Sequence, residues 1–232
     1  MGNKRRYRRE NNMDLYLFLG IGTVAMFFAM FLCRKKYQIP VWKTVCLCIL
    51  LTAIGLLGTK IMAFIESGSF AGRSFFGAVF LIPVLMSVLA LAFREKISAV
   101  LDMTAPSVCV MLALMKVKCL IDGCCGGKVI YHNSQFQPVF FPSQAVEAAV
   151  ALCIAVLLII LILKGKFVGE IYPVFMIVYG ITRFGLNFFR YAYSPIFIGL
   201  AVGNIWALVS IAVGVIWIAV SVVRKKKKGA CK

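Results

Sequence analysis

Long apolar runs separated by short polar segments set the pattern of this chain. A helix needs about 20 predominantly apolar residues to cross a hydrocarbon core about 30 Å thick. Seven runs meet that length, and they lie at residues 14–33, 41–63, 75–93, 97–121, 143–163, 169–190 and 196–223. The pattern therefore predicts an all-α, polytopic membrane helix bundle of about seven transmembrane helices, with the two termini on opposite sides.

The composition agrees with this prediction. Hydrophobic residues make up 62% of the 232 positions, and charged residues make up only 15%. Such a chain has too little polar surface to cover a soluble globule. We therefore expect an integral membrane protein.

Basic residues gather beside four of the polar segments, at 34–36, 94–96, 164–166 and 224–228. All four positions fall on one predicted face of the membrane, and an excess of lysine and arginine marks the cytoplasmic face. The C-terminus is therefore predicted to be cytoplasmic. The formal net charge of +18 is attributed to membrane orientation and to attraction for anionic headgroups. Nucleic-acid binding is not expected, because no soluble domain is present to carry it.

Residues 1–13 form a basic N-terminal tail that conflicts with this orientation. Lysine and arginine fill most of positions 4–9, and seven spans place them on the face opposite the other basic clusters. We hypothesise that Met13 is the true start, because Met13 and Asp14 begin the first apolar run. The predicted organisation is then a membrane domain at 14–223 followed by a basic cytoplasmic tail at 224–232.

One predicted span carries an unusual set of polar residues. At about 100° per residue, Tyr179, Arg183, Asn187 and Arg190 fall within roughly an 80° arc of one helix face. A charge near the bilayer centre costs at least about 3 kcal/mol. We therefore expect this polar stripe to face the bundle interior or a wet cavity and to mark a functional site.

Further polar residues flank the long loop at 123–141. Lys116 lies near the end of the run before this loop, at the most polar helix end of the chain. The glycine pair Gly126 and Gly127 either offers backbone amides as an anion nest or forms a plain turn. Glu147, one turn into the next run, either faces the headgroup layer or pairs with a cation.

Three features have simpler structural interpretations. Asp102 precedes Pro106, and a proline inside a helix frees backbone groups, so Asp102 is interpreted as a cap for backbone amides. Lys60 lies near the outer end of the second run, where a lysine side chain commonly reaches toward the interface. Gly199 and Gly203 open the last run in a small-xxx-small pattern suited to close helix packing.

The nine cysteines do not form a recognisable framework. Most lie in or beside apolar runs, where a thiol behaves as a small hydrophobic group. Cys119, Cys124 and Cys125 lie instead where the fourth run gives way to the loop, with His132 nearby. Their Cys-x4-Cys-Cys spacing lacks the Cys-x2-Cys unit of common zinc and redox centres. No metal or cofactor is therefore expected.

The order of these polar blocks resembles the prolipoprotein diacylglyceryl transferase family of bacterial membrane enzymes. The resemblance covers about residues 14–223 and is best after residue 100. Lys60, in Gly58-Thr59-Lys60, fits a weaker block of that family, and Tyr16 falls near a functional tyrosine of the first span. The stronger matching blocks lie at residues 102–106, 116–127, 141–147, 179–183 and 199–204.

The resemblance implies an activity, partners and a site. Members of the family transfer a diacylglyceryl group from phosphatidylglycerol to the lipobox cysteine thiol of a prolipoprotein, and they release glycerol phosphate. The resemblance also implies a location in the bacterial plasma membrane. The catalytic residues carried over are Arg183, Tyr179 and Lys116, and Arg183 suits phosphate because a guanidinium makes a bidentate match. The substrate-binding residues carried over are Lys60, Tyr16, Gly123, Gly127, Gln144, Glu147, Asn187 and Asn204.

This sequence also departs from the family pattern. Lys116 stands where the family has arginine, Cys119 where it has asparagine, and Phe76 where it has a histidine implicated in the chemistry. Cys124 and Asn187 each replace a glutamate. Lysine keeps the charge of arginine but loses its planar fork, and the usual base is missing.

Two other functions therefore remain as alternatives. The first is a catalytically inactive, lipid-binding membrane protein of the same fold, which the missing histidine and glutamate positions favour. The second is a membrane thiol or metal protein that uses Cys119, Cys124 and Cys125. A transporter finds no support, because no inverted repeat or pair of broken helices is evident.

Overall fold

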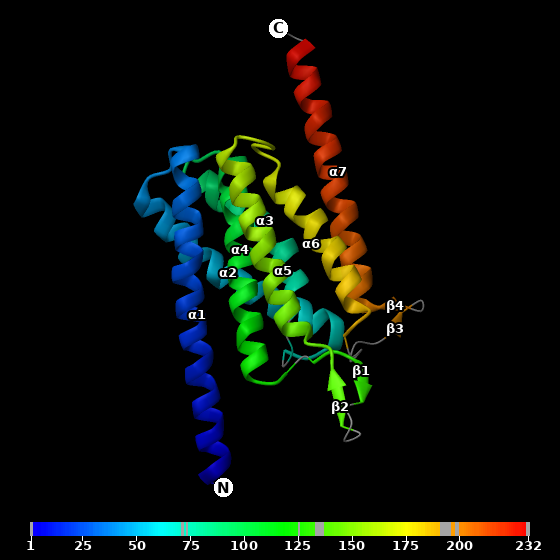
Figure 1. Ribbon diagram of the computed structural model, residues 1–232. Coiled ribbons are helices and arrows are strands. Elements are labelled where there is room, and N and C mark those ends of the chain that lie inside the picture. Colours follow the sequence, from blue (N-terminus) through cyan, green and yellow to red (C-terminus); the bar gives the residue numbers. More distant parts are fainter. Residues whose placement is uncertain are drawn as a thin grey trace.

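The structure, a computed structural model, describes the backbone of residues 2–70, 72, 74–124, 126–132, 137–190, 196–197 and 200–230. Within these ranges the protein has seven α-helices and two short antiparallel hairpins (Figure 1). The helices are α1 (Gly2–Tyr37), α2 (Val41–Ser67), α3 (Phe75–Ala92), α4 (Ile97–Ile121), α5 (Ser143–Leu163), α6 (Ile171–Asn187) and α7 (Val202–Ala230). The strands are β1 (Val129–His132) paired with β2 (Pro138–Phe140), and β3 (Ile196–Phe197) paired with β4 (Leu200–Ala201). The predicted all-α bundle is confirmed.

Helices α2 to α5 begin and end close to the predicted bounds, whereas helices α1, α6 and α7 do not. Helix α1 begins at Gly2 rather than at residue 14. Helix α6 has 17 residues, a length of about 26 Å, and it ends before Arg190. Helix α7 begins at Val202 because strands β3 and β4 occupy the start of the last apolar run. Among the described residues, six helices are long and apolar enough to cross a membrane, and α6 is the helix that falls short.

The helices run alternately up and down, so the bundle has two distinct ends (Figure 1). The end that carries β1 and β2 is called the hairpin end. The opposite end, called the basic end, holds the connections α1–α2, α3–α4 and α5–α6 and the last turns of α7. Helix α4 lies at the centre of the bundle, and 72% of its most apolar window is buried.

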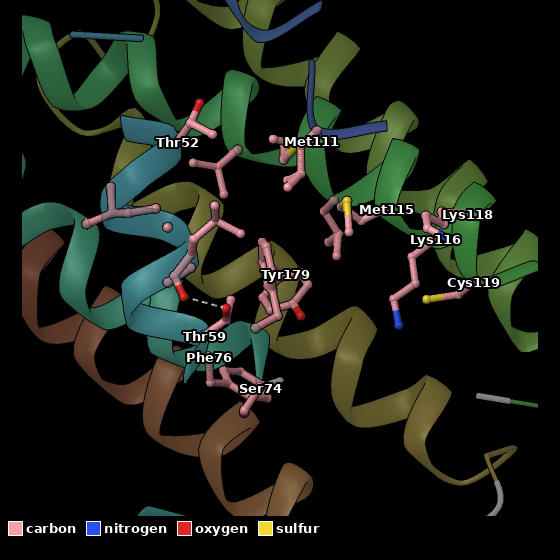
Figure 2. A pocket seen from close by; sticks show the side chains of 18 of the residues that line it. Thr52, Thr59, Ser74, Phe76, Met111, Met115, Lys116, Lys118, Cys119 and Tyr179 are labelled. Carbon is pink, nitrogen blue, oxygen red and sulfur yellow. Dashed lines mark hydrogen bonds between the residues drawn. The ribbon is translucent and has the colours of Figure 1, made fainter. Parts of the chain in front are cut away.

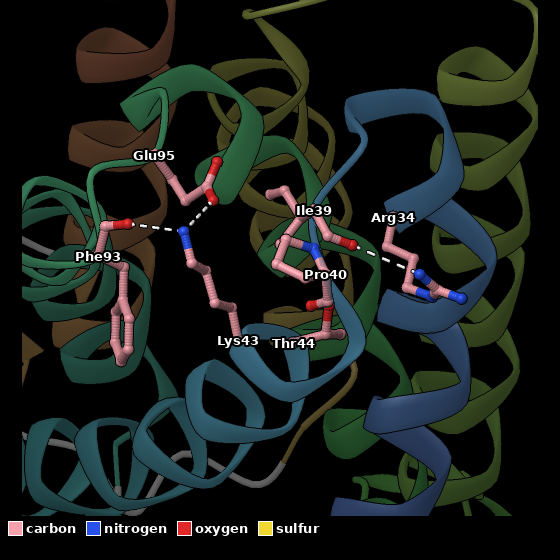
Figure 3. Close-up of polar contacts among 7 residues, drawn as sticks. All are labelled: Arg34, Ile39, Pro40, Lys43, Thr44, Phe93 and Glu95. Atoms are coloured by element: carbon pink, nitrogen blue, oxygen red, sulfur yellow. Dashed lines mark hydrogen bonds and ion pairs between the residues drawn. The ribbon is translucent and has the colours of Figure 1, made fainter.

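Polar contacts fix the connections at the basic end (Figure 3). The Lys43 ammonium donates to the Phe93 carbonyl at 2.9 Å and to Glu95 at 2.6 Å, which ties α2 to the α3–α4 turn. Asp102 does act as a cap, but for a different helix from the one expected. Its carboxylate accepts the amides of Gly169 at 2.6 Å and Ile171 at 3.0 Å, so it caps the start of α6.

Glycine allows two helix pairs to approach closely. A Cβ atom added to Gly77 in α3 would lie 1.9 Å from the Gly58 carbonyl oxygen in α2. A Cβ atom added to Gly180 in α6 would lie 2.9 Å from the Ala207 carbonyl oxygen in α7. These contacts hold α3 and α6 in the positions from which they line the site described next.

Candidate functional site

Glu147 binds three cations at the hairpin end of the bundle. Its Oε2 atom lies 2.5 Å from Lys116 Nζ, and its Oε1 atom lies 2.6 Å from Arg183 Nη1 and 3.5 Å from Arg190 Nε. The side chains are largely buried, with exposed fractions of 6% for Glu147, 14% for Lys116 and 16% for Arg183. Of the two interpretations of Glu147, the structure shows cation pairing. The four residues are called the Glu147 cluster.

Three helices and one turn bring this cluster together. Lys116 lies near the end of α4, Glu147 in the second turn of α5, and Arg183 near the end of α6. Arg190 does not share the α6 helix face, as the stripe predicted, because it lies in the turn after the helix. There its backbone bridges to Gly127, and this pairing brings its guanidinium to Glu147.

The Glu147 cluster carries an excess of positive charge. Three cations against one carboxylate leave a formal charge of +3 − 1 = +2. The Nε atom of Arg183 is also buried, and it has no hydrogen-bond partner among the described residues. Unpaired buried donors in native proteins call for an explanation such as a ligand. The arrangement therefore suits an anion.

The cluster borders a cavity of about 610 Å³ whose lining is partly polar and mostly apolar. Lys116, Arg183 and Arg190 line its polar part, together with Tyr179. In Figure 2 the Lys116 side chain and the Tyr179 ring reach into the same hollow between the helices. The remaining wall is mostly apolar and includes Leu15, Leu19, Met26, Leu51, Leu56, Ile82, Val108, Met111, Leu112 and Met115. A ligand with an anionic head and apolar chains matches this distribution.

Tyr179 is held in an aromatic group beside Arg183. Its ring centroid lies 5.2 Å from that of Phe75, 5.6 Å from that of Phe76 and 5.7 Å from that of Phe175. Phe76 is itself buried and lines the cavity. The place where the family pattern has histidine is therefore an apolar part of the wall.

The residues around the long loop have mainly structural contacts. Gln144 is buried, and its Nε2 atom donates to the Cys124 carbonyl. The amide of Gly127 donates to the Phe141 carbonyl at 3.1 Å, so this amide is not free for an anion nest. A Cβ atom added to Gly127 would lie 2.5 Å from that same carbonyl oxygen. Gly123 adopts a φ of +65° in an exposed turn, a conformation that favours glycine.

Two predicted asparagines lie where α6 meets α7. Asn204 is 4% exposed, and its Oδ1 atom has no hydrogen-bond partner within the described part of the chain. The same holds for the buried Nδ2 atom of Asn187, which approaches Gly203 on the cavity wall. Gly203 lines the cavity, whereas Asn187 and Asn204 lie beside it and are not part of its wall. Gly199, the first residue of the expected packing motif, lies outside the described residues.

Two other predicted site residues lie apart from the cluster. The Lys60 ammonium donates to the carbonyls of Phe70 at 2.6 Å and Gly72 at 3.3 Å, where it stabilises the α2–α3 connection. Tyr16 is 70% exposed on α1. Neither of them lines the cavity, although Leu15, the neighbour of Tyr16, does.

Cys119 and Cys124 both line the cavity, while Cys125 lies outside the described residues. Among the residues that are described, no group of three or more His, Cys, Asp or Glu side chains is placed to hold a metal ion. His132 is exposed on β1. The described thiols Cys119 and Cys124 therefore border the cavity and belong to no ligand set of that kind.

The sequence did not single out two acidic residues of this cavity. Both carboxylate oxygens of Asp122 accept hydrogen bonds from the Lys118 ammonium, at 2.7 Å and 2.8 Å. Glu66, at the end of α2, accepts a hydrogen bond from Ser74 at 2.8 Å. The i, i+4 spacing of Lys118 and Asp122 could have revealed the first pair. Nothing local marks Glu66, because an acidic residue at the end of a span is ordinary.

Two comparisons with known proteins show which family this sequence is similar to. A model of the prolipoprotein diacylglyceryl transferase family matches residues 23–220. The chain is also similar to the phosphatidylglycerol–prolipoprotein diacylglyceryl transferase of Clostridium tetani, at 28% identity over 100 residues. That alignment covers 39% of this chain and 40% of the relative.

Proposed function

Because the chain belongs to the prolipoprotein diacylglyceryl transferase family, we propose that it transfers a diacylglyceryl group from phosphatidylglycerol to the cysteine thiol of a prolipoprotein. The observation that carries this proposal is the Glu147 cluster, with a formal charge of +2, at the polar part of an amphipathic cavity. The family resemblance found in the sequence is confirmed. The identities of the donor lipid and of the acceptor thiol are what we propose.

The reaction exchanges a carbon–oxygen bond for a carbon–sulfur bond. The acceptor thiol loses its proton, and the sulfur attacks the glycerol carbon of the diacylglyceryl group. The bond from that carbon to the phosphate ester oxygen breaks, and glycerol phosphate leaves with the electron pair. The phosphate passes from one negative charge as a diester to two as a monoester. Cations fixed beside it stabilise this charge most strongly as it develops.

Arg183 and Lys116 are the residues placed to hold that phosphate. Arg183 uses Nη1 on Glu147, and its buried Nε–H is without a partner among the described residues, so a phosphate oxygen would satisfy it. Lys116 adds a compact charge with further donors. Glu147 holds both cations in place before the lipid arrives, and pre-oriented charges act without reorganisation during the reaction.

The membrane supplies the orientation in this proposal. With the basic end in the cytoplasm, the Glu147 cluster lies toward the outer face of a bacterial plasma membrane. The apolar wall formed by α1, α2 and α4 then accommodates acyl chains, while Tyr179 orients the head beside Arg183. The prolipoprotein reaches the same end of the bundle.

One observation favours a second candidate function. Phe76 replaces the histidine of the family pattern and is buried in the cavity wall, so the usual base is missing. A protein that binds phosphatidylglycerol without transferring any group would retain the cluster and the cavity. The experiment below separates binding from transfer.

The test uses the purified full chain in vesicles of phosphatidylglycerol, with a synthetic peptide that carries a lipobox cysteine. Transfer predicts a peptide that gains the mass of one diacylglyceryl group, together with equimolar glycerol phosphate. Vesicles of phosphatidylcholine, and a peptide with serine in place of cysteine, should give neither product. Lipid binding without any product would support the second function and overturn the first.

Variants then assign the site. Arg183→Ala should abolish detectable product, whereas Lys164→Ala at the basic end is the matched cation control and should keep the wild-type rate. The double variant Cys124→Ser, Cys125→Ser tests the alternative of a thiol or metal protein. Only that alternative requires these sulfur atoms, so the double variant should keep its transfer activity. Full activity of Arg183→Ala would overturn the assignment of the phosphate site.

A further inference from the structure

The cavity wall lacks a proton acceptor at the position where the family pattern has one. Phe76 lies there, packed against Tyr179 and with its ring centroid 6.2 Å from that of Phe80. An acceptor thiol must still lose a proton before its sulfur can attack. A base must therefore come from another residue of the cavity or from water.

Three carboxylates of the described residues lie at or beside the cavity, and two of them are bound to cations. Glu147 binds three cations, and Asp122 receives both contacts from Lys118. Glu66 also lines the cavity. Among the described residues, its side-chain hydrogen bond comes from the neutral hydroxyl of Ser74, and no salt bridge to it is formed. Of the three, Glu66 is the carboxylate that keeps an oxygen available.

Ser74 holds Glu66 in an unusual way. Ser74 occupies the N-cap position of α3, where a serine hydroxyl usually accepts a hydrogen bond from a backbone amide of the first turn. No such capping bond forms. The hydroxyl instead donates to Glu66 Oε1 at 2.8 Å, which fixes the carboxylate and leaves Oε2 for another partner.

The location of Glu66 suits a proton transfer next to the phosphate site. The residues that line the cavity with Glu66 include Phe76, Tyr179 and Arg183. Glu66 and Arg183 also interact electrostatically. The base and the leaving group would therefore act in one continuous space, from different helices.

We propose that Glu66 accepts the proton of the acceptor thiol, with Ser74 as the residue that positions it. This inference rests on the proposed function. The S–H bond breaks with the proton going to Glu66 Oε2, the sulfur forms its bond to the glycerol carbon, and the carbon–oxygen bond to phosphate breaks. The glycerol phosphate that leaves, or water, then takes the proton and restores the carboxylate.

The test compares Glu66→Gln with the wild-type chain in the vesicle assay between pH 6.5 and pH 9.5. A positioned general base contributes about 100-fold or more, so the variant should lose at least that factor at pH 6.5. Its binding of phosphatidylglycerol, measured in detergent micelles, should be unchanged. A free thiol has a pKa of about 8.5. At high pH the peptide thiol ionises without help, and the deficit of the variant should shrink toward about tenfold or less.

A structural role for Glu66 predicts a different result. A loss that stays constant from pH 6.5 to pH 9.5, or a rate within threefold of wild type at every pH, would overturn the proposal. Ser74→Ala serves as a second variant in case Glu66→Gln does not fold. It should lose about tenfold at pH 6.5 and recover in the same way, and a flat profile would count against the proposal. If the wild-type chain gives no product while it binds the lipid, the proposed function itself fails.

Discussion

Lys116 and Arg183 hold opposite oxygens of the same carboxylate. Lys116 Nζ lies 2.5 Å from Oε2 of Glu147, and Arg183 Nη1 lies 2.6 Å from Oε1. Helices α4 and α6 are thereby joined through α5 at the hairpin end of the bundle. The same three residues join these helices and contribute charge to the cavity, so a substitution here should change both stability and the proposed lipid binding.

The first prediction concerns Glu147→Gln. The substitution removes the carboxylate and leaves three cations close together, and breaking a buried ion pair in this way costs about 3 to 5 kcal/mol. Thermal unfolding in detergent micelles should show the loss of stability. Glu95→Gln breaks the pair between Glu95 and the single cation Lys43, which keeps its hydrogen bond to the Phe93 carbonyl, so this variant should lose less stability than Glu147→Gln. Equal losses in the two variants would contradict a central role for Glu147.

The second prediction concerns Lys116. The family pattern has arginine here, and a guanidinium can bind the carboxylate and a phosphate at once. Lys116→Arg should therefore retain activity or raise kcat/KM by a few fold. Lys116→Met keeps the length of the side chain and removes its charge, and it should lower kcat/KM by at least about tenfold. A Lys116→Met variant as active as the wild type would remove Lys116 from the phosphate site.

Much of the bundle follows from the apolar pattern. Helices α2, α3, α4 and α5 occupy the predicted runs because a long apolar segment in a membrane satisfies its backbone groups only as a helix. The end of α6 could not be predicted in this way. The amide of Lys128 donates to the Phe189 carbonyl at 2.9 Å, and this contact, about 60 residues apart in sequence, draws the chain out of the helix before Arg190.

The candidate site, like the fold, could be predicted only in part from the sequence. The cost of polar residues in a membrane was enough to predict that Tyr179 and Arg183 face the interior, whereas Lys116 entered the predicted site through the family resemblance. Their convergence on Glu147 depends on the rotation of α4, α5 and α6 about their axes, which no local pattern encodes. Glu66 was missed for a related reason, since only the tertiary fold places the last turn of α2 on the cavity wall.

The third prediction concerns Gly77. A Cβ atom there would lie 1.9 Å from the Gly58 carbonyl oxygen and 2.6 Å from Met62 Cβ, so Gly77→Ala must separate α2 from α3. Overpacking of this kind costs about 1 to 3 kcal/mol, and the thermal unfolding midpoint should fall. Gly20→Ala is the control, because the added Cβ meets nothing within 4 Å. An alanine gains helix propensity at that position, so the control should be neutral or stabilising. Equal midpoints for the two variants would contradict close α2–α3 packing.

The last prediction concerns pH at the basic end. Glu170 lies in the connection before α6, and the hydrogen bond from the Lys225 ammonium is the main reason that the pKa of its carboxyl lies below the ordinary value of 4.5. A carboxyl whose pKa is lower in the folded state contributes stability above its unfolded pKa, and this contribution is lost as the pH falls through the folded value. The link between α7 and the start of α6 should therefore weaken below about pH 4.5.

Thermal unfolding midpoints of the wild type and Glu170→Gln, measured from pH 7 to pH 3, test this directly. The variant cannot form the charged contact at any pH, so it should be less stable at pH 7, and the two midpoints should converge toward pH 3. A difference that stays constant over the whole range would show that the carboxylate charge of Glu170 contributes nothing.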